Sequence, residues 1–345
     1  MKTTNTVSYN DLFFSKTNDY LNNYIAHQTG QSPHTRIQYK TGLSKFYDYI
    51  NKKNLSVMKF RFSDCSLQLL LDYIQFLLES EKLKPSTINV RITAIREYLK
   101  YASDCDIDIL PVYMIACKLP TLTVPHVFRP IIEKKDLAGF LDSPKHTRIG
   151  NRDRFILILL YDSAIRVQEM VSLSLGDITI TGNDVSILIK GKGRKERCIE
   201  LSEKAAKQAI AYLNEYHTKP WNPEAPLFFT TIHGIVNRMS IRNVQRILKK
   251  YGKISKQTSD SIPDNVYPHM LRRTRATSLY RDNVPIEQIS ALLGHSDIET
   301  TREHYAQPSD EQLKEMMNRA VKEEPDSSEH LDIDVDKIKS KFGLA

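Results

Sequence analysis

Residues 155–173 read FILILLYDSAIRVQEMVSL and open with the longest apolar run of this 345-residue chain. The apolar positions fill most of the stretch, so it predicts a largely buried helix or a pair of helices. Two charged side chains, Arg166 and Glu169, are set into it one helical turn apart. A buried arginine is costly without a partner, and an ion pair with Glu169 is the plain structural interpretation of both residues.

The segment after this stretch predicts a β-hairpin followed by helices. In DVSILIKGKGRKERCIEL (184–201), apolar Val185, Ile187 and Ile189 alternate before a Gly-Lys-Gly turn that carries Lys192. Residues 202–217 and 240–256 have helical periodicity. The second of these helices carries a set of basic residues at a spacing that can line one side facing a nucleic acid groove: Arg242, Arg246, Lys249 and Lys250.

The first third of the chain is predicted to be helical. Apolar residues repeat at intervals of three and four in residues 11–28, 34–53 and 66–82. A fourth helix is expected to start at Pro85, with Ser86 or Thr87 as its N-cap. Arg91 and Arg96 lie off its apolar face, where they can contact phosphates or simply remain solvated.

A proline-rich segment separates this helical region from the rest of the chain. KLPTLTVPHVFRP (118–130) holds three prolines in thirteen residues and has no periodicity, which indicates a linker. We therefore expect a helical domain at 1–117, a linker at 118–128, a second domain at 129–322 and an acidic tail at 323–345. The fold class is mainly α with a small antiparallel β-sheet, the second domain being mixed α/β.

Charge and composition narrow the classes of function. The net charge is +8, and the tail from residue 323 contributes −4, so the remaining body carries +12 and suggests a polyanionic partner, nucleic acid first. The apolar run is too short to span a membrane, and the N-terminal residues lack a signal peptide, so we expect a cytoplasmic, nucleoid-associated protein. Four scattered cysteines show no metal-binding spacing.

Taken one by one, the polar residues of the second domain are more often structural than catalytic, but together they suit phosphoryl transfer. Two guanidiniums can hold both non-bridging oxygens of a phosphodiester, and a lysine can protonate the leaving oxygen. A tyrosine becomes a usable nucleophile when a histidine takes its proton. No carboxylate cluster suggests a metal site, so neither a metal nor another cofactor is expected. The candidate residues are Arg166, Lys192, His269, Arg272, His295 and Tyr305.

Four short motifs in this region resemble the tyrosine recombinase (integrase) family. AIRVQEMVSL resembles its first arginine box, IKGKGRKER its lysine hairpin, PHMLRRT its H-x-x-R box and LLGHSDIETT its third box, all in family order within residues 155–308. The basic helices before the linker also resemble, less specifically, the SAM-like core-binding domain of the family. This resemblance implies two domains that form a C-shaped clamp on DNA.

The resemblance also implies a role for each candidate residue. Arg166 and Arg272 would clamp the scissile phosphate, with Glu169 supporting the first arginine. Lys192 would be the general acid and His269 the general base. His295 would donate a hydrogen bond to the phosphate, and Tyr305, ten residues after His295 where many relatives have nine, would be the nucleophile.

The implied reaction is site-specific recombination through a 3′-phosphotyrosyl intermediate and a Holliday junction. The implied partners are duplex DNA with inverted-repeat core sites, three further copies of the chain contacted through a helix at 309–322, and accessory proteins. Integration or excision of a mobile element is the expected task, with inversion and chromosome dimer resolution also open. A type IB topoisomerase and a non-catalytic DNA-binding factor on the same scaffold remain alternatives.

Overall fold

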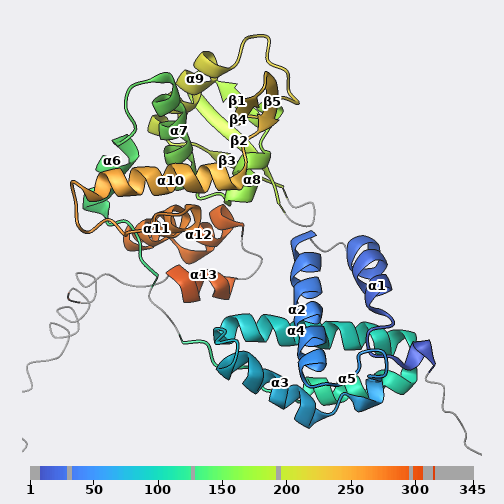
Figure 1. Cartoon of the computed structure of the whole chain (residues 1–345). Helices are drawn as coiled ribbons and strands as arrows, with labels where there is room; N and C mark the ends of the chain where they lie inside the picture. Colours follow the sequence, from blue (N-terminus) through green and yellow to red (C-terminus); the bar gives the residue numbers. More distant parts are fainter. Residues whose placement is uncertain are drawn as a thin grey trace, which may run out of the picture. The chain divides into compact units, whose positions relative to one another are not determined.

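The chain forms two compact units, residues 1–128 and residues 129–345. The computed structural model describes residues 8–28, 33–125, 129–191, 196–294, 298–305 and 314. Over these residues the protein is mostly helical, with one three-stranded and one two-stranded antiparallel sheet (Figure 1), which confirms the predicted fold class. None of the described helices is long and apolar enough to cross a membrane.

The first unit is helical and packs around an aromatic core. The ring of Phe13 lies 5.3 Å from those of Phe46 and Phe62, and its carbonyl accepts a hydrogen bond from Tyr98 Oη. Gly42 allows α2 and α4 to approach, because a Cβ there would lie 2.6 Å from Ala94 Cβ. The elements are η1 (Tyr9–Asp11), α1 (Thr17–Asp19), η2 (Tyr20–Gln28), α2 (Pro33–Lys52), η3 (Phe62–Asp64), α3 (Leu67–Glu79), α4 (Pro85–Cys105), η4 (Ile107–Ile109) and α5 (Leu110–Cys117).

Two details of this unit differ from expectation. The N-cap of α4 is Lys84, with Pro85 at the first helical position, so Ser86 and Thr87 lie inside the helix instead of capping it. Proline favours that first position because its missing N–H needs no partner there. The start of the expected linker is tied to α4, since Asn89 exchanges two hydrogen bonds of 2.9 Å with the backbone of Leu122.

The second unit surrounds a central buried helix, α7. The run from Phe155 to Leu160 is buried on every side, which explains its uninterrupted apolar sequence. A short turn leads to α8, so the stretch at 155–173 belongs to a helix pair, the second of the two predicted alternatives. The elements are α6 (Lys134–Asp142), α7 (Arg148–Asp162), α8 (Val167–Ser172), η5 (Leu175–Asp177), β1 (Ile178–Thr181), β2 (Asp184–Lys190), β3 (Glu196–Glu200), α9 (Glu203–Tyr216), β4 (Phe229–Ile232), β5 (Ile235–Arg238), α10 (Ile241–Lys256), α11 (Pro268–Arg281), α12 (Ile286–Leu293) and α13 (Ile298–Tyr305).

The predicted hairpin is confirmed as β2 and β3, which pair antiparallel with β2 in the middle of the three-stranded sheet. Val185, Ile187 and Ile189 are buried in alternation, as a half-buried strand requires. The turn at 192–195 lies outside the described residues. The edge strand β1 and the separate β4–β5 hairpin were not predicted from the sequence, because each strand has only four residues.

Candidate active site

The turn between α7 and α8 places Arg166 at the N-cap of α8. Ala164 in this turn has a φ of 49°, an unfavourable conformation for a residue other than glycine. Its carbonyl accepts a hydrogen bond of 2.6 Å from Arg272 Nη1, so the strained backbone supplies a hydrogen-bond acceptor for a second arginine. The turn therefore joins Arg166 and Arg272, which are more than one hundred residues apart in the sequence.

Arg272 is almost fully buried, with 1% of its surface exposed. Besides Ala164, it donates a 2.6 Å hydrogen bond from Nη2 to the carbonyl of Leu293, the last residue of α12. Arg166 Nη2 lies 3.4 Å from the next carbonyl, that of Gly294. Both guanidiniums thus converge on the end of α12.

Glu169, the third residue of α8, binds both the backbone and the side chain of Arg166 and is itself bound by a third arginine. It accepts hydrogen bonds from the backbone N–H of Arg166 at 2.9 Å and from its Nη1 at 3.1 Å. Arg197 in β3 donates to both oxygens of the same carboxylate, at 3.2 and 2.8 Å. Burial opposes ionisation, but the hydrogen bonds and charges of Arg197 and Arg166 outweigh it and hold the pKa of Glu169 below its ordinary value.

His269 lies in the first turn of α11, one turn before Arg272. Partial desolvation of its ring lowers the pKa of His269, and the positive charges of Arg272 and Arg166 lower it further. The lowered pKa favours the neutral imidazole, the state in which a histidine can accept a proton. This suits the predicted role of a general base.

The side chains of three of the six candidate residues lie outside the part of the chain that the structure describes. Lys192 and His295 lie outside the described residues, and Tyr305 is described only as the last residue of α13. The neighbouring Lys190 is described, and its ammonium is 2.7 Å from Asp177 Oδ1. Asp177 raises the pKa of Lys190 through this hydrogen bond and its charge, which makes Lys190 a poor proton donor.

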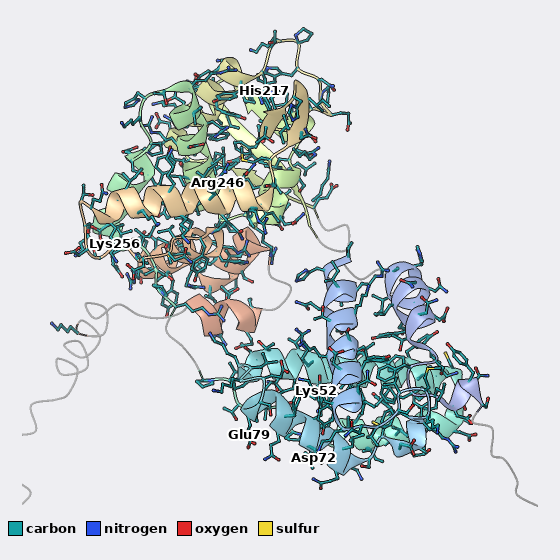
Figure 2. The ribbon with its side chains drawn as sticks, in the orientation of Figure 1. Lys52, Asp72, Glu79, His217, Arg246 and Lys256 are labelled. Atoms are coloured by element: carbon teal, nitrogen blue, oxygen red, sulfur yellow. The ribbon has the colours of Figure 1, made fainter. Side chains whose placement is uncertain are left out.

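The predicted DNA-contacting residues of the second unit share the exposed side of α10. Val244, Ile247, Leu248 and Tyr251 face the core, while the opposite face is exposed and basic. Figure 2 labels Arg246 on this helix. The helix contains no acidic residue. Within the described residues, no ion pair involves the exposed basic side chains Arg242, Arg246, Lys249, Lys250 and Lys253.

The two arginines proposed for DNA contact in the first unit have different surroundings. Arg96 donates to the carbonyls of Ala116 and Leu119 and so fastens the end of α5 to α4. These bonds give Arg96 a structural role, and its phosphate contact stays a prediction. Arg91 is half-buried near Tyr73, and its phosphate contact stays a prediction.

Arg197 is the residue of this cluster that sequence reasoning missed. In the sequence it stands within the motif IKGKGRKER, where only Lys192 is a candidate residue. A signal was present, because Arg197 is two residues before the buried Ile199 and pairs with Ile189 across the sheet, so alternation places it on the inward face. Among the described residues, no group of three or more His, Cys, Asp or Glu side chains is arranged to hold a metal ion.

Comparisons with known proteins identify the family of this chain. The sequence profile described as the Phage integrase family matches residues 130–312, and that of the phage integrase N-terminal SAM-like domain matches residues 18–104. Tyrosine recombinase XerC of Psychromonas ingrahamii is 26% identical over 81% of this chain and 88% of its own length. XerC of Staphylococcus carnosus is 28% identical over 83% of this chain and 90% of its own length.

Solved structures with the same fold include recombinases bound to DNA. XerH site-specific recombinase bound to a palindromic difH substrate aligns with a TM-score of 0.62 and 19% identity, over 83% of this chain and 78% of that chain. A lambda integrase tetramer bound to a Holliday junction aligns with a TM-score of 0.57 and 13% identity, over 86% of this chain and 78% of that chain. From the family profile that covers the catalytic unit, this chain belongs to the phage integrase family of tyrosine recombinases.

Proposed function

We propose that this protein is a site-specific recombinase that cuts and rejoins duplex DNA through a covalent tyrosine intermediate. The observation that carries the proposal is the convergence of Arg166 and Arg272 on the two carbonyls at the end of α12. Two guanidiniums held at one point by backbone groups make a preformed site for a phosphate that gains negative charge in the transition state. The helix α13, which ends at Tyr305, follows that point after only a few residues.

In the proposed reaction, Tyr305 Oη attacks the scissile phosphorus while the bond from phosphorus to the 5′ oxygen breaks. His269 takes the phenolic proton, and Lys192 protonates the leaving 5′ oxygen. Arg166, Arg272 and His295 stabilise the phosphorane. The 5′ hydroxyl of a partner strand then attacks the 3′-phosphotyrosyl bond and releases the tyrosine. One phosphodiester bond is exchanged for another, so the step needs no external energy source.

We propose that α10 binds the DNA backbone or groove with its basic face, and that the two units close around the duplex as a clamp. Assembly would bring four copies together on two inverted-repeat core sites. The segment 309–322, which lies outside the described residues apart from residue 314, is the proposed contact between copies. Accessory proteins remain a proposal from the resemblance, and sequencing the junctions formed in cells would identify the biological task.

The recombinase and its alternatives differ in the products that they release. We expect the protein to form a covalent adduct on a nicked suicide substrate and to transfer strands between two duplexes carrying its site. A type IB topoisomerase would relax a supercoil without joining two duplexes. A non-catalytic DNA-binding factor would form no adduct. Strand transfer products on a denaturing gel, with adducts on a protein gel, distinguish the three outcomes.

Lys192→Ala is expected to slow cleavage of an ordinary phosphodiester, because the 5′ oxygen then leaves without a proton. A substrate with sulfur at the bridging 5′ position should recover most of the rate, since a thiolate needs no proton to leave. Single-turnover cleavage of both substrates measures the effect. Lys190→Ala is the matched control, because Asp177 already holds that ammonium, and it should affect both substrates little. Equal defects of Lys192→Ala on both substrates would contradict its role as general acid.

Removal of Arg246 and Lys249 together is expected to flatten the salt dependence of DNA binding. Each phosphate contact contributes a slope of roughly −0.9 in log K against log salt, so two lost contacts should reduce the slope by about two. The binding constant is measured by fluorescence anisotropy between low and physiological salt. Lys204→Ala with Lys207→Ala is the matched control, since these α9 lysines already pair with Asp142 and Glu203. An unchanged slope in the Arg246 and Lys249 variant would place α10 away from DNA.

A further inference from the structure

Arg197 lies between α8, which carries Glu169, and the end of α12 at Gly294. Both Glu169 and Gly294 contact Arg166. Arg197 comes from β3, a few residues after Lys192 in the sequence, and only 17% of its side chain is exposed. Its two terminal nitrogens bind the two oxygens of Glu169, at 3.2 and 2.8 Å. Such a forked pair fixes the orientation of a carboxylate better than a single contact does.

Arg197 also packs against the end of α12. Gly294 has a φ of 63°, and a Cβ on it would lie 2.9 Å from Arg197 Nη1 and 3.1 Å from Arg197 Cζ. The glycine therefore lets the guanidinium lie directly against the backbone. The carbonyl of the same Gly294 lies 3.4 Å from Arg166 Nη2. Arg197 thus contacts both partners of Arg166, the carboxylate and the α12 turn.

The sharing of Glu169 decides how Arg166 is used. Each carboxylate oxygen accepts one hydrogen bond from Arg197 and one from Arg166, and the guanidinium of Arg166 supplies only a single one of them. Glu169 with two arginines leaves a net charge of +1. With Arg197 absent, the charges of Glu169 and Arg166 would cancel. Both oxygens of Glu169 would be free to bind the guanidinium of Arg166 and would turn that guanidinium away from a phosphate.

We infer that Arg197 is a positioning residue, which occupies Glu169 and supports the Gly294 turn so that Arg166 keeps its positive charge and its direction for the scissile phosphate. This inference rests on the proposed DNA cleavage. The role of Arg197 differs from a purely structural one because it depends on the charge of the Arg197 side chain. Loss of Arg197 should therefore slow cleavage, and either a neutral scissile phosphate or removal of the Glu169 charge should relieve this defect.

Arg197→Met is expected to cleave an ordinary suicide substrate about 100-fold more slowly than the wild type, a loss similar to that of one donor to the transition state. On a substrate with a methylphosphonate at the scissile position, which lacks the negative charge, the loss should be about tenfold smaller. The double variant Arg197→Met with Glu169→Gln should cleave the ordinary substrate at least tenfold faster than Arg197→Met alone, because the released carboxylate no longer captures Arg166.

Two further variants separate positioning from folding. Arg238→Met removes a guanidinium that binds the carbonyls of Ser172 and Leu173, at the other end of α8 and away from Glu169. Any loss in this control should be equal on the two substrates. Arg197→Lys keeps the charge but loses the fork, so the ratio of the two rates should stay within about twofold of the wild type. If Arg197→Met does not fold, Arg197→Gln takes its place in the comparison.

Equal losses of Arg197→Met on the charged and neutral substrates, or a double variant no faster than the single one, would overturn the inference. Absence of an adduct from the wild type would instead refute the proposed function. Thermal unfolding of each variant is recorded beside the rates, so that a loss of folded protein is corrected before the substrates are compared.

Discussion

Tyr305→Phe protein is expected to bind its DNA site with unchanged affinity and to form no covalent adduct. The substitution removes one hydroxyl, and Tyr305 is the only tyrosine after position 295 in the chain. Without the nucleophile, cleavage should fall by roughly 10⁴-fold or more, the scale seen when an essential catalytic group is removed. Incubation with a nicked suicide substrate, followed by a denaturing protein gel, measures the adduct, and anisotropy measures binding.

Tyr280→Phe is the matched control for this experiment. It makes the same chemical change on α11, where Tyr280 packs against the small cluster of Ala164, Ala276, Ile289 and Leu293. The control should form adducts at close to the rate of the wild type. Recovery of an adduct from Tyr305→Phe would show that another residue attacks the phosphorus.

Arg272→Met is expected to lose both activity and stability. In the folded protein its guanidinium satisfies the buried carbonyls of Ala164 and Leu293, each at 2.6 Å. Leaving buried acceptors without donors costs about 1–3 kcal/mol each, so the unfolding midpoint of this unit should fall by several degrees. Cleavage should fall by at least about 10³-fold, since one arm of the phosphate clamp is missing.

Arg272→Lys separates the two losses, because it keeps the charge and removes the fork that spans the two carbonyls. We expect it to be more stable than Arg272→Met but still at least about 10²-fold slower than the wild type. Arg275→Lys is the matched control: Arg275 lies one helical turn further along α11, above the Tyr161 ring and 3.7 Å from Asp162. A cleavage defect of Arg275→Lys as large as that of Arg272→Lys would contradict a specific role for Arg272. Calorimetry and single-turnover cleavage provide the two measurements.

Local sequence patterns predicted the elements that each bury one continuous face. The helices α2, α3, α7, α9 and α10 and the β2–β3 hairpin were expected because apolar spacing records which side of an element faces the core. Short elements gave no comparable pattern. The four-residue strands β4 and β5 are too brief for alternation to be distinguished from chance, and their burial depends on neighbours elsewhere in the chain.

The sequence by itself determined the candidate residues of the site: two arginines, two histidines, a lysine and a tyrosine in a fixed order along a basic chain. Only the tertiary structure decided how the arginines are used, because their partners are distant in the sequence. Arg272 binds the carbonyl of Ala164, which is 108 residues away in the sequence, whereas Arg96 donates hydrogen bonds to the carbonyls at the end of α5. The alternation of β3 places Arg197 on the inward face, but only the folded sheet shows that its partner there is Glu169. The sequence states which side chains are charged, but the packing of distant elements determines which partner each charged side chain contacts.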